Sequence, residues 1–251
     1  MNKIIVSKEK INYIGDSALV IDGNKIIFKE ASDYEIIYDN IDDVCLELEI
    51  INGRVVILES SFGNKLRVNN IYNIHCGSAD INKFYCNESV SEKITINLFE
   101  DGDTVNYNFA NICKSVEEYQ IDVYHKNKNT KSNIRNKVVA INDSRVHFVI
   151  NSTVYKECIK SVLDQNTRVV TFDNAEATVS PNMFIDLDDV MAKHGSVIGT
   201  FKDDQIFYLM SKGISYNDSL KLLVRGFLLA NKMISVDTRK KITDIIDMYW
   251  R

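Results

Sequence analysis

The feature that most constrains this chain is a long succession of short β-branched and aromatic runs, with no helical pattern between them over the first 200 residues. These runs, such as residues 25–28, 94–99 and 146–150, predict strands of four to six residues separated by turn signals such as Asp101-Gly102-Asp103. Because no helices intervene, an α/β sheet is excluded, and a sandwich, a barrel or a β-solenoid remains. No repeat of fixed period is visible, so the pattern alone does not choose among them.

The pattern becomes helical after the last β run. Asp203 and Asp204 precede a short apolar face, which predicts a first helix. Ser215 and Asp218 form a capping-box pattern ahead of apolar residues spaced i, i+3, i+4, i+7 and i+8, which predicts a second helix. A third helix is predicted to begin near Ser235.

Charge divides at the same boundary. Residues 202–251 hold nine Lys and Arg against six Asp and Glu, a net charge of +3, and the whole chain carries −5, so residues 1–201 carry −8. We therefore expect a β domain over residues 1–201 and a helical domain over residues 202–251. The acidic body argues against a nucleic-acid-coating protein. The basic tail suggests a docking element, or a solvated helix face around Arg239-Lys240-Lys241.

Several classes of protein are disfavoured by missing signals. No apolar run approaches the roughly 20 residues that span a bilayer, and the N-terminus lacks the apolar stretch of a signal peptide, so we expect a cytoplasmic protein without membrane contact. The five cysteines are odd in number and never spaced as C-x-x-C, which favours reduced thiols. No phosphate-binding glycine loop, G-x-S-x-G elbow or H-E-x-x-H motif is present, so we expect no enzyme activity.

Two positions remain as candidate sites on local grounds. Asp186, Asp188 and Asp189 follow a predicted strand, where they form either a solvated turn or the acidic groups of a carbohydrate-binding or carbohydrate-active β-solenoid. His194 lies at the expected joint between the last strand and the first helix, where side chains are exposed. It acts there either as a functional group or as a cap of the turn.

Longer stretches around this joint carry a resemblance. They are A-T-V-S-P-N-M-F-I-D at residues 177–186, K-H-G-S-V-I-G at 193–199, D-Q-I-F-Y-L-M-S-K-G-I-S at 204–215 and L-L-V-R-G-F at 222–227. Together these stretches resemble the SufB/SufD family of iron–sulfur cluster assembly scaffolds. His125, Thr130 and Ser132 resemble a weaker upstream motif of the same family.

The resemblance implies a fold, partners and site residues. The fold is a right-handed parallel β-helix core with a small C-terminal α-helical domain. The partners are a SufC-like ABC ATPase on the helices and, through the β-helix, either a SufB- or SufD-like subunit or a second copy of the chain. The cofactor is an iron–sulfur cluster held transiently with the partner, with His194 as an iron or cluster ligand. Phe207, Tyr208, Arg225 and Phe227 are the partner-binding candidates, since aromatic and arginine side chains dominate interfaces.

The chain also departs from the family pattern. It enters β-like sequence directly, which suggests a short form without the family's N-terminal helical region. Residues 174–176 are Asn, Ala and Glu where SufB-like members carry a cysteine, and Ala192 stands where SufD-like members often have Cys-x-His. The remaining cluster ligands are therefore expected from a partner or from one of the five thiols, with Cys158 as the first candidate.

Overall fold

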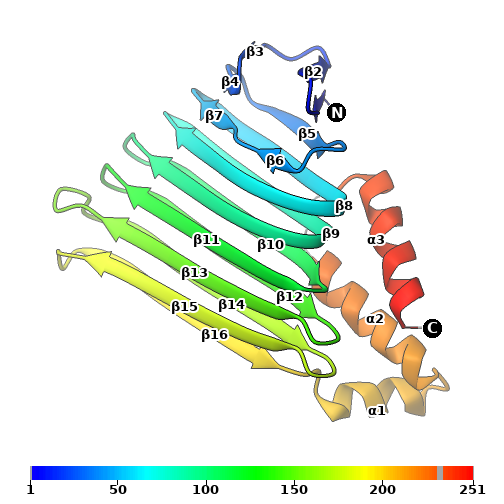
Figure 1. Cartoon of the computed structure of the whole chain (residues 1–251). Coiled ribbons are helices and arrows are strands. Elements are labelled where there is room, and N and C mark those ends of the chain that lie inside the picture. Colours follow the sequence, from blue (N-terminus) through cyan, green and yellow to red (C-terminus); the bar gives the residue numbers. More distant parts are fainter. Residues whose placement is uncertain (1, 231–233, 251) are drawn as a thin grey trace.

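The chain forms a parallel β-solenoid of about six turns with three helices beside it (Figure 1). The computed structural model describes residues 2–230 and 234–250. The strands are β1 (Asn2–Val6), β2 (Ile11–Ile14), β3 (Leu19–Asp22), β4 (Lys25–Phe28), β5 (Ser32–Tyr38), β6 (Asp43–Val44), β7 (Glu47–Ile50), β8 (Gly53–Ile74), β9 (Gly77–Leu98), β10 (Thr104–Cys113), β11 (Val116–His125), β12 (Lys131–Ala140), β13 (Arg145–Val154), β14 (Ser161–Thr171), β15 (Glu176–Ile185) and β16 (Val190–Gly199). The helices are α1 (Asp203–Ser211), α2 (Tyr216–Leu229) and α3 (Val236–Tyr249).

Each turn of the solenoid supplies one strand to each of two parallel sheets. The helix-side face runs through β16, β14, β12, β10 and the first halves of β9 and β8. The far face runs through β15, β13, β11 and the second halves of β9 and β8. Antiparallel pairs, β1 with β2 and β3 with β4, stand at the N-terminal end. The β-solenoid with C-terminal helices confirms the fold class implied by the resemblance.

The strands are longer than the sequence pattern predicts. Strands β10 to β16 span ten or eleven residues each, and β8 and β9 span 22 residues each. The sequence Phe62-Gly63-Asn64 has residues typical of a turn, but it lies within β8, where Gly63 has a φ of 125° and stays in register with Asn87 of β9. Pairing with the neighbouring turn therefore carries the strand through a sequence that alone indicates a break.

The spacing between successive turns varies along the chain. Register partners lie 24 residues apart between β8 and β9, 27 between β10 and β12, 31 between β12 and β14, and 29 between β14 and β16. Because the loops absorb these differences, the strands stack in register although the sequence has no fixed period.

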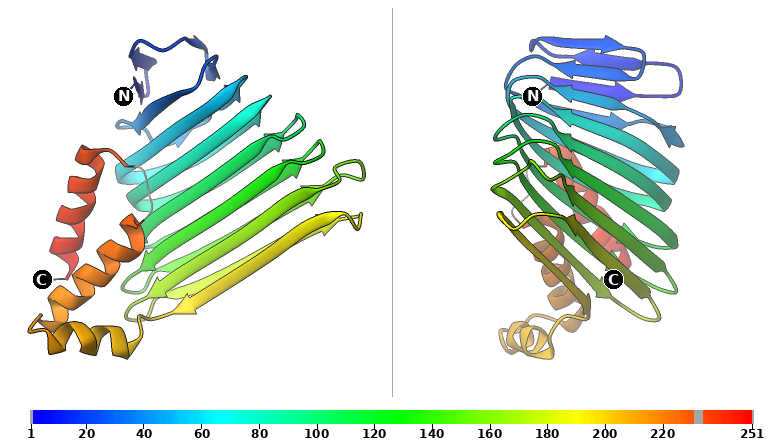
Figure 2. Two further views of the ribbon diagram at one scale, coloured as in Figure 1. Left: turned by 180° about the vertical axis from the view of Figure 1, so that it is seen from behind. Right: turned by 90° about the vertical axis from the view of Figure 1, so that its left-hand side faces the viewer.

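The solenoid interior is a continuous apolar core, and the helices add a second one. Ile57, Ile81 and Phe109 are among the interior side chains with no exposed surface. A separate cluster joins outward-facing strand residues to all three helices, and includes Phe84, Ala110, Ile112, Val139 and Val170 from the strands with Ile206, Val224, Leu228, Ile242 and Ile246 from the helices. The helices thus lie beside the solenoid near one end of its strands (Figure 2).

The predicted helix starts are confirmed at two of the three helices. The Ser215 hydroxyl accepts the backbone N–H of Asp218 at 3.2 Å, and the Ser235 hydroxyl accepts that of Thr238 at 3.2 Å. At α1 the N-cap is Lys202, which makes no side-chain cap bond, and the two aspartates occupy the first turn instead. There they complement the positive end of the helix dipole.

Candidate functional site

The last turn of the solenoid is an open end. In the described part of the chain β15 pairs only with β13, and β16 only with β14, so each leaves one edge without a strand partner. Large apolar side chains are exposed along these strands, with exposed fractions of 57% for Phe184, 66% for Met191 and 56% for Val197. An unpaired strand edge beside exposed apolar side chains is a surface suited to pairing with another chain.

His194 lies on this open end. It is in the middle of β16, not at the strand-to-helix joint predicted from the sequence, since β16 continues to Gly199. Its register partner on β14 is Gln165, whose buried side chain donates to Ser152 Oγ at 2.7 Å. Side chains in register share a face, so His194 lies on the interior side of the solenoid and is exposed because no further turn covers it.

No ready-made metal centre surrounds His194 in residues 2–230 and 234–250. No three side chains of the His, Cys, Asp and Glu types converge there on a common point. Cys158 is buried, and its thiol donates to the backbone carbonyl of His125 at 3.0 Å. Burial raises the pKa of the Cys158 thiol, which disfavours the thiolate that binds metals.

The acidic candidates of the carbohydrate hypothesis are exposed at the loop from β15 to β16. Asp186 forms an exposed ion pair with Lys156 at 3.2 Å, and the backbone carbonyl of Asp189 accepts the N–H of Lys160 at 2.6 Å. Asp188 is also exposed. This arrangement is that of a solvated turn.

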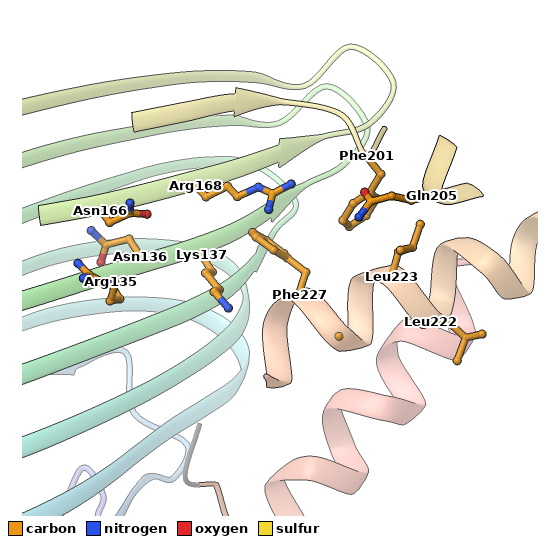
Figure 3. Close-up of a pocket in the computed structure, with 11 residues that line it drawn as sticks. Arg135, Asn136, Lys137, Asn166, Arg168, Phe201, Gln205, Leu222, Leu223 and Phe227 are labelled. Carbon is orange, nitrogen blue, oxygen red and sulfur yellow. The ribbon is translucent and has the colours of Figure 1, made fainter. Parts of the chain in front are cut away.

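The four partner-binding candidates fall into different environments. Phe207 and Tyr208 of α1 are 65% and 63% exposed. Arg225 forms an ion pair with Asp247, which joins α2 to α3. Phe227 is 8% exposed, and its ring packs edge-on against Phe201 in the cleft between α2 and the strands (Figure 3).

A buried ionic cluster inside the solenoid was not predicted from the sequence. Lys83 Nζ lies 3.1 Å from Glu59 Oε2 and 3.0 Å from Glu92 Oε1, and all three side chains are buried. Tyr72 donates to Glu59, and Tyr107 donates to Glu92 at 3.1 Å. Burial acts to lower the pKa of Lys83, but the two carboxylates raise it well above its ordinary value. Side chains point alternately inward and outward along β9, and this alternation places Lys83 inside the solenoid. The same alternation in the sequence is the signal from which a buried lysine could have been predicted.

The fold and these surfaces define a class of protein, a parallel β-solenoid with an open end and a helical tail. Residues 80–227 match the family described as SUF system FeS cluster assembly, SufBD core domain, and this match covers more than half of the chain. The chain belongs to the SufBD family of iron–sulfur cluster assembly proteins. The resemblance found in the sequence is thereby confirmed.

Individual relatives agree with this assignment. The chain is 23% identical over 172 residues to the iron–sulfur cluster assembly protein SufD of Bacillus subtilis. The aligned region covers 61% of this chain and 39% of that protein. It is 27% identical over 158 residues to a SufBD family protein of Mycobacterium leprae, covering 59% and 40%. It is 40% identical over 53 residues to SufD of Escherichia coli, covering 21% and 12%. The matches thus span about two fifths or less of these relatives.

None of the helices that the structure describes is both long enough and apolar enough to cross a bilayer.

Proposed function

We propose that the chain is a scaffold subunit of a SUF-type iron–sulfur cluster assembly complex in the cytoplasm and has no catalytic activity of its own. The observation that carries this proposal is the family match over residues 80–227, which runs from the solenoid through α1 and most of α2. Both surfaces proposed for partners, the open end and the exposed side of the helices, lie within or directly beside this matched region.

The helices supply the docking surface for a SufC-like ABC ATPase. Phe207 and Tyr208 support this role because they are large aromatic side chains that the fold leaves in solvent. Arg225 contributes by fixing α2 against α3 through Asp247. Phe227 contributes from beneath, where it anchors α2 to the solenoid.

Binding of the ATPase is tested by titrating it against the chain carrying Phe207→Ser and Tyr208→Ser. Each aromatic hot spot is worth about 2 kcal/mol or more, so we expect affinity to fall at least roughly 30-fold. Met248→Ser is the matched control, because Met248 is 56% exposed on α3. Unchanged affinity of the double variant would contradict docking through Phe207 and Tyr208, and an equal loss in the control would show that the effect is not specific to these two side chains.

The open end supplies the contact with a second β-helix subunit, either another copy or a SufB-like partner. Its unpaired strand edges and exposed apolar residues support this pairing. Val197→Lys should therefore reduce the assembled fraction measured by analytical ultracentrifugation. Ile14→Lys is the control, because Ile14 is 60% exposed at the other end of the solenoid. Equal assembly of both variants would exclude this edge as the interface.

His194 is positioned at this contact to bind iron or a cluster that is cargo of the complex. A neutral imidazole is a suitable iron ligand, and the remaining ligands come from the partner or from one of the five thiols, since the described residues hold no group of three His, Cys, Asp or Glu side chains that could bind a metal. Anaerobic reconstitution of the complex with iron and sulfide should give a lower iron content for His194→Ala than for wild type. His147→Ala, an exposed histidine on the far face, is the control. Equal iron content in both variants would make His194 structural.

A further inference from the structure

A cavity between the helix-side face and α2 has a chemistry that the scaffold role does not use. Its volume is about 480 Å³, and strands β12 and β14 form one wall while α1, α2 and the preceding linker form the other (Figure 3). Three of its lining side chains are cationic, namely Arg135, Lys137 and Arg168, and none of the eleven lining residues is acidic. This basic cavity, here called the cationic cavity, lies at the edge of a domain whose net charge is −8.

Two of these cations lack a carboxylate partner. Arg135 pairs with Asp164 at 2.6 Å, whereas Lys137 and Arg168 form no ion pair with any residue that the structure describes. Lys137 and Arg168 are register partners on adjacent strands, so both side chains leave the same face of the sheet, and their charged groups lie on either side of the Phe227 ring (Figure 3). Burial, and then the charge of Arg168, lower the pKa of Lys137. Two half-buried like charges in this position repel each other unless an anion neutralises them.

Contact with the Phe227 ring does not neutralise the positive charges of Lys137 and Arg168. The Lys137 ammonium and the Arg168 guanidinium lie 5.5 Å and 5.3 Å from its centroid. A cation–π contact leaves most of the donor hydrogens of both groups without acceptors. The ring lies between the two charged groups and holds both of them beside the cavity (Figure 3).

The remaining wall matches an organic ligand. Asn166 and Gln205 contribute amides, while Phe201 and Leu223 contribute apolar surface. The guanidinium fork of Arg168 is suited to the oxygens of a phosphate, and Lys137 adds a second positive charge toward balancing the phosphate charge of nearly −2. The volume lies within the range of small-molecule sites and exceeds that of phosphate alone.

We propose that the cationic cavity binds a small organic phosphate, with its phosphate group on Arg168, its organic part against Phe201 and Leu223, and Lys137 adding positive charge from the other side of Phe227. This proposal does not depend on the partners proposed above.

Gly226 offers a way to test the site without damaging the fold. It lies within α2 and lines the cavity, and a Cβ at this position would meet no atom within 4 Å. Its φ lies outside the left-handed region, and replacing a glycine inside a helix favours the helix. Gly226→Leu should therefore fill the cavity while the chain keeps its thermal stability.

The experiment is isothermal titration of the full chain with pyrophosphate and, separately, adenosine monophosphate, at low ionic strength. We expect both to bind, the nucleotide more tightly because of the apolar wall, and we expect Arg168→Gln to weaken both about tenfold or more. Gly226→Leu should abolish nucleotide binding. Lys131→Gln is the control, because Lys131 is an exposed cation on β12 outside the cavity.

Four results would overturn the proposal. They are the absence of binding by the wild type, an equal loss in Arg168→Gln and Lys131→Gln, full nucleotide binding by a folded Gly226→Leu variant, and binding of an oligoglutamate peptide in place of both phosphates. The last result would assign the cavity to an acidic segment of a partner protein.

Discussion

Replacing Lys83 with methionine tests whether the buried ionic cluster stabilises the solenoid by charge compensation. The substitution keeps the length of the side chain but leaves the carboxyl groups of Glu59 and Glu92 buried without a cation. Removing one partner of a buried ion pair costs about 3–5 kcal/mol. The tyrosines that donate to each carboxyl group offset part of this cost, so we expect a loss near 3 kcal/mol at pH 7.5.

The loss should depend on pH in a defined direction. Without the lysine, burial disfavours the ionised form of both carboxyl groups and no cation offsets this cost. The variant should therefore lose stability as the pH rises from acidic values, where neutral carboxyl groups can stay buried. A triple variant that also carries Glu59→Gln and Glu92→Gln should recover most of the stability and lose this pH dependence.

The assay is urea denaturation followed by far-UV circular dichroism and tyrosine fluorescence, at pH 5 and at pH 7.5. Coincident transitions establish whether a single free energy of unfolding describes the solenoid. Lys131→Met, an exposed lysine, serves as the control and should change stability by no more than about 0.5 kcal/mol. A loss below about 1 kcal/mol for Lys83→Met, with no change between the two pH values, would refute the charge-compensation argument.

Three further predictions follow from other buried groups. Burial lowers the pKa of His125 to about 4, below its value near 6.5 in the unfolded chain. The free energy of unfolding should therefore fall by up to about 3 kcal/mol as the pH falls from 6.5 to 4. Urea titrations of His125→Gln should show a weaker dependence on pH. Of the five thiols, only Cys45 and Cys76 are exposed, so a thiol reagent should modify two rapidly in the native chain and five in urea. Deleting residues 202–251 uncovers the apolar cluster beneath the helices, and should increase binding of a hydrophobic dye and promote aggregation.

The sequence predicted the helices well because helix signals are local. Ser215 and Ser235 cap the helices that follow them, and each cap depends only on residues within one turn. The choice of a solenoid over a sandwich or a barrel came from the family resemblance, since register between distant strands leaves no local signal. The division into domains at residues 201 and 202 stays a prediction, although the helices share an apolar cluster with the strands.

The strand predicted at residues 146–150 continues to Val154, although asparagine, a residue of low β propensity, follows at position 151. Asn151 and Asn182 lie within strands of the far face, where Asn182 donates to Asn151 at 2.9 Å and Asn151 donates to Asp122 at 2.7 Å. Parallel strands in register bring equivalent positions together, so amide side chains bond from one turn to the next. This ladder favours asparagine inside a strand, against its propensity in isolation.

The positions of the candidate site residues also depend on how the strands stack, which the sequence does not show. His194 was expected at the joint with the helices, but its exposure comes from being on the last turn, a property of the stack and not of its neighbours in sequence. Lys137 and Arg168 are 31 residues apart and meet only through the register of β12 and β14. The sequence contains both residues but not their proximity.

The cluster beneath the helices also fixes an order of events during synthesis. Phe84 and Ala110 leave the ribosome long before Val224 and Ile242, the helix residues that cover the same surface. The earlier turns of the solenoid can therefore stack while the apolar side chains on their outer face are still exposed to solvent. These side chains stay exposed until more than a hundred further residues have been translated. A nascent chain of this kind is a substrate for chaperones that bind apolar surface, and a ribosome stalled before α2 would leave a folded solenoid that is prone to self-association.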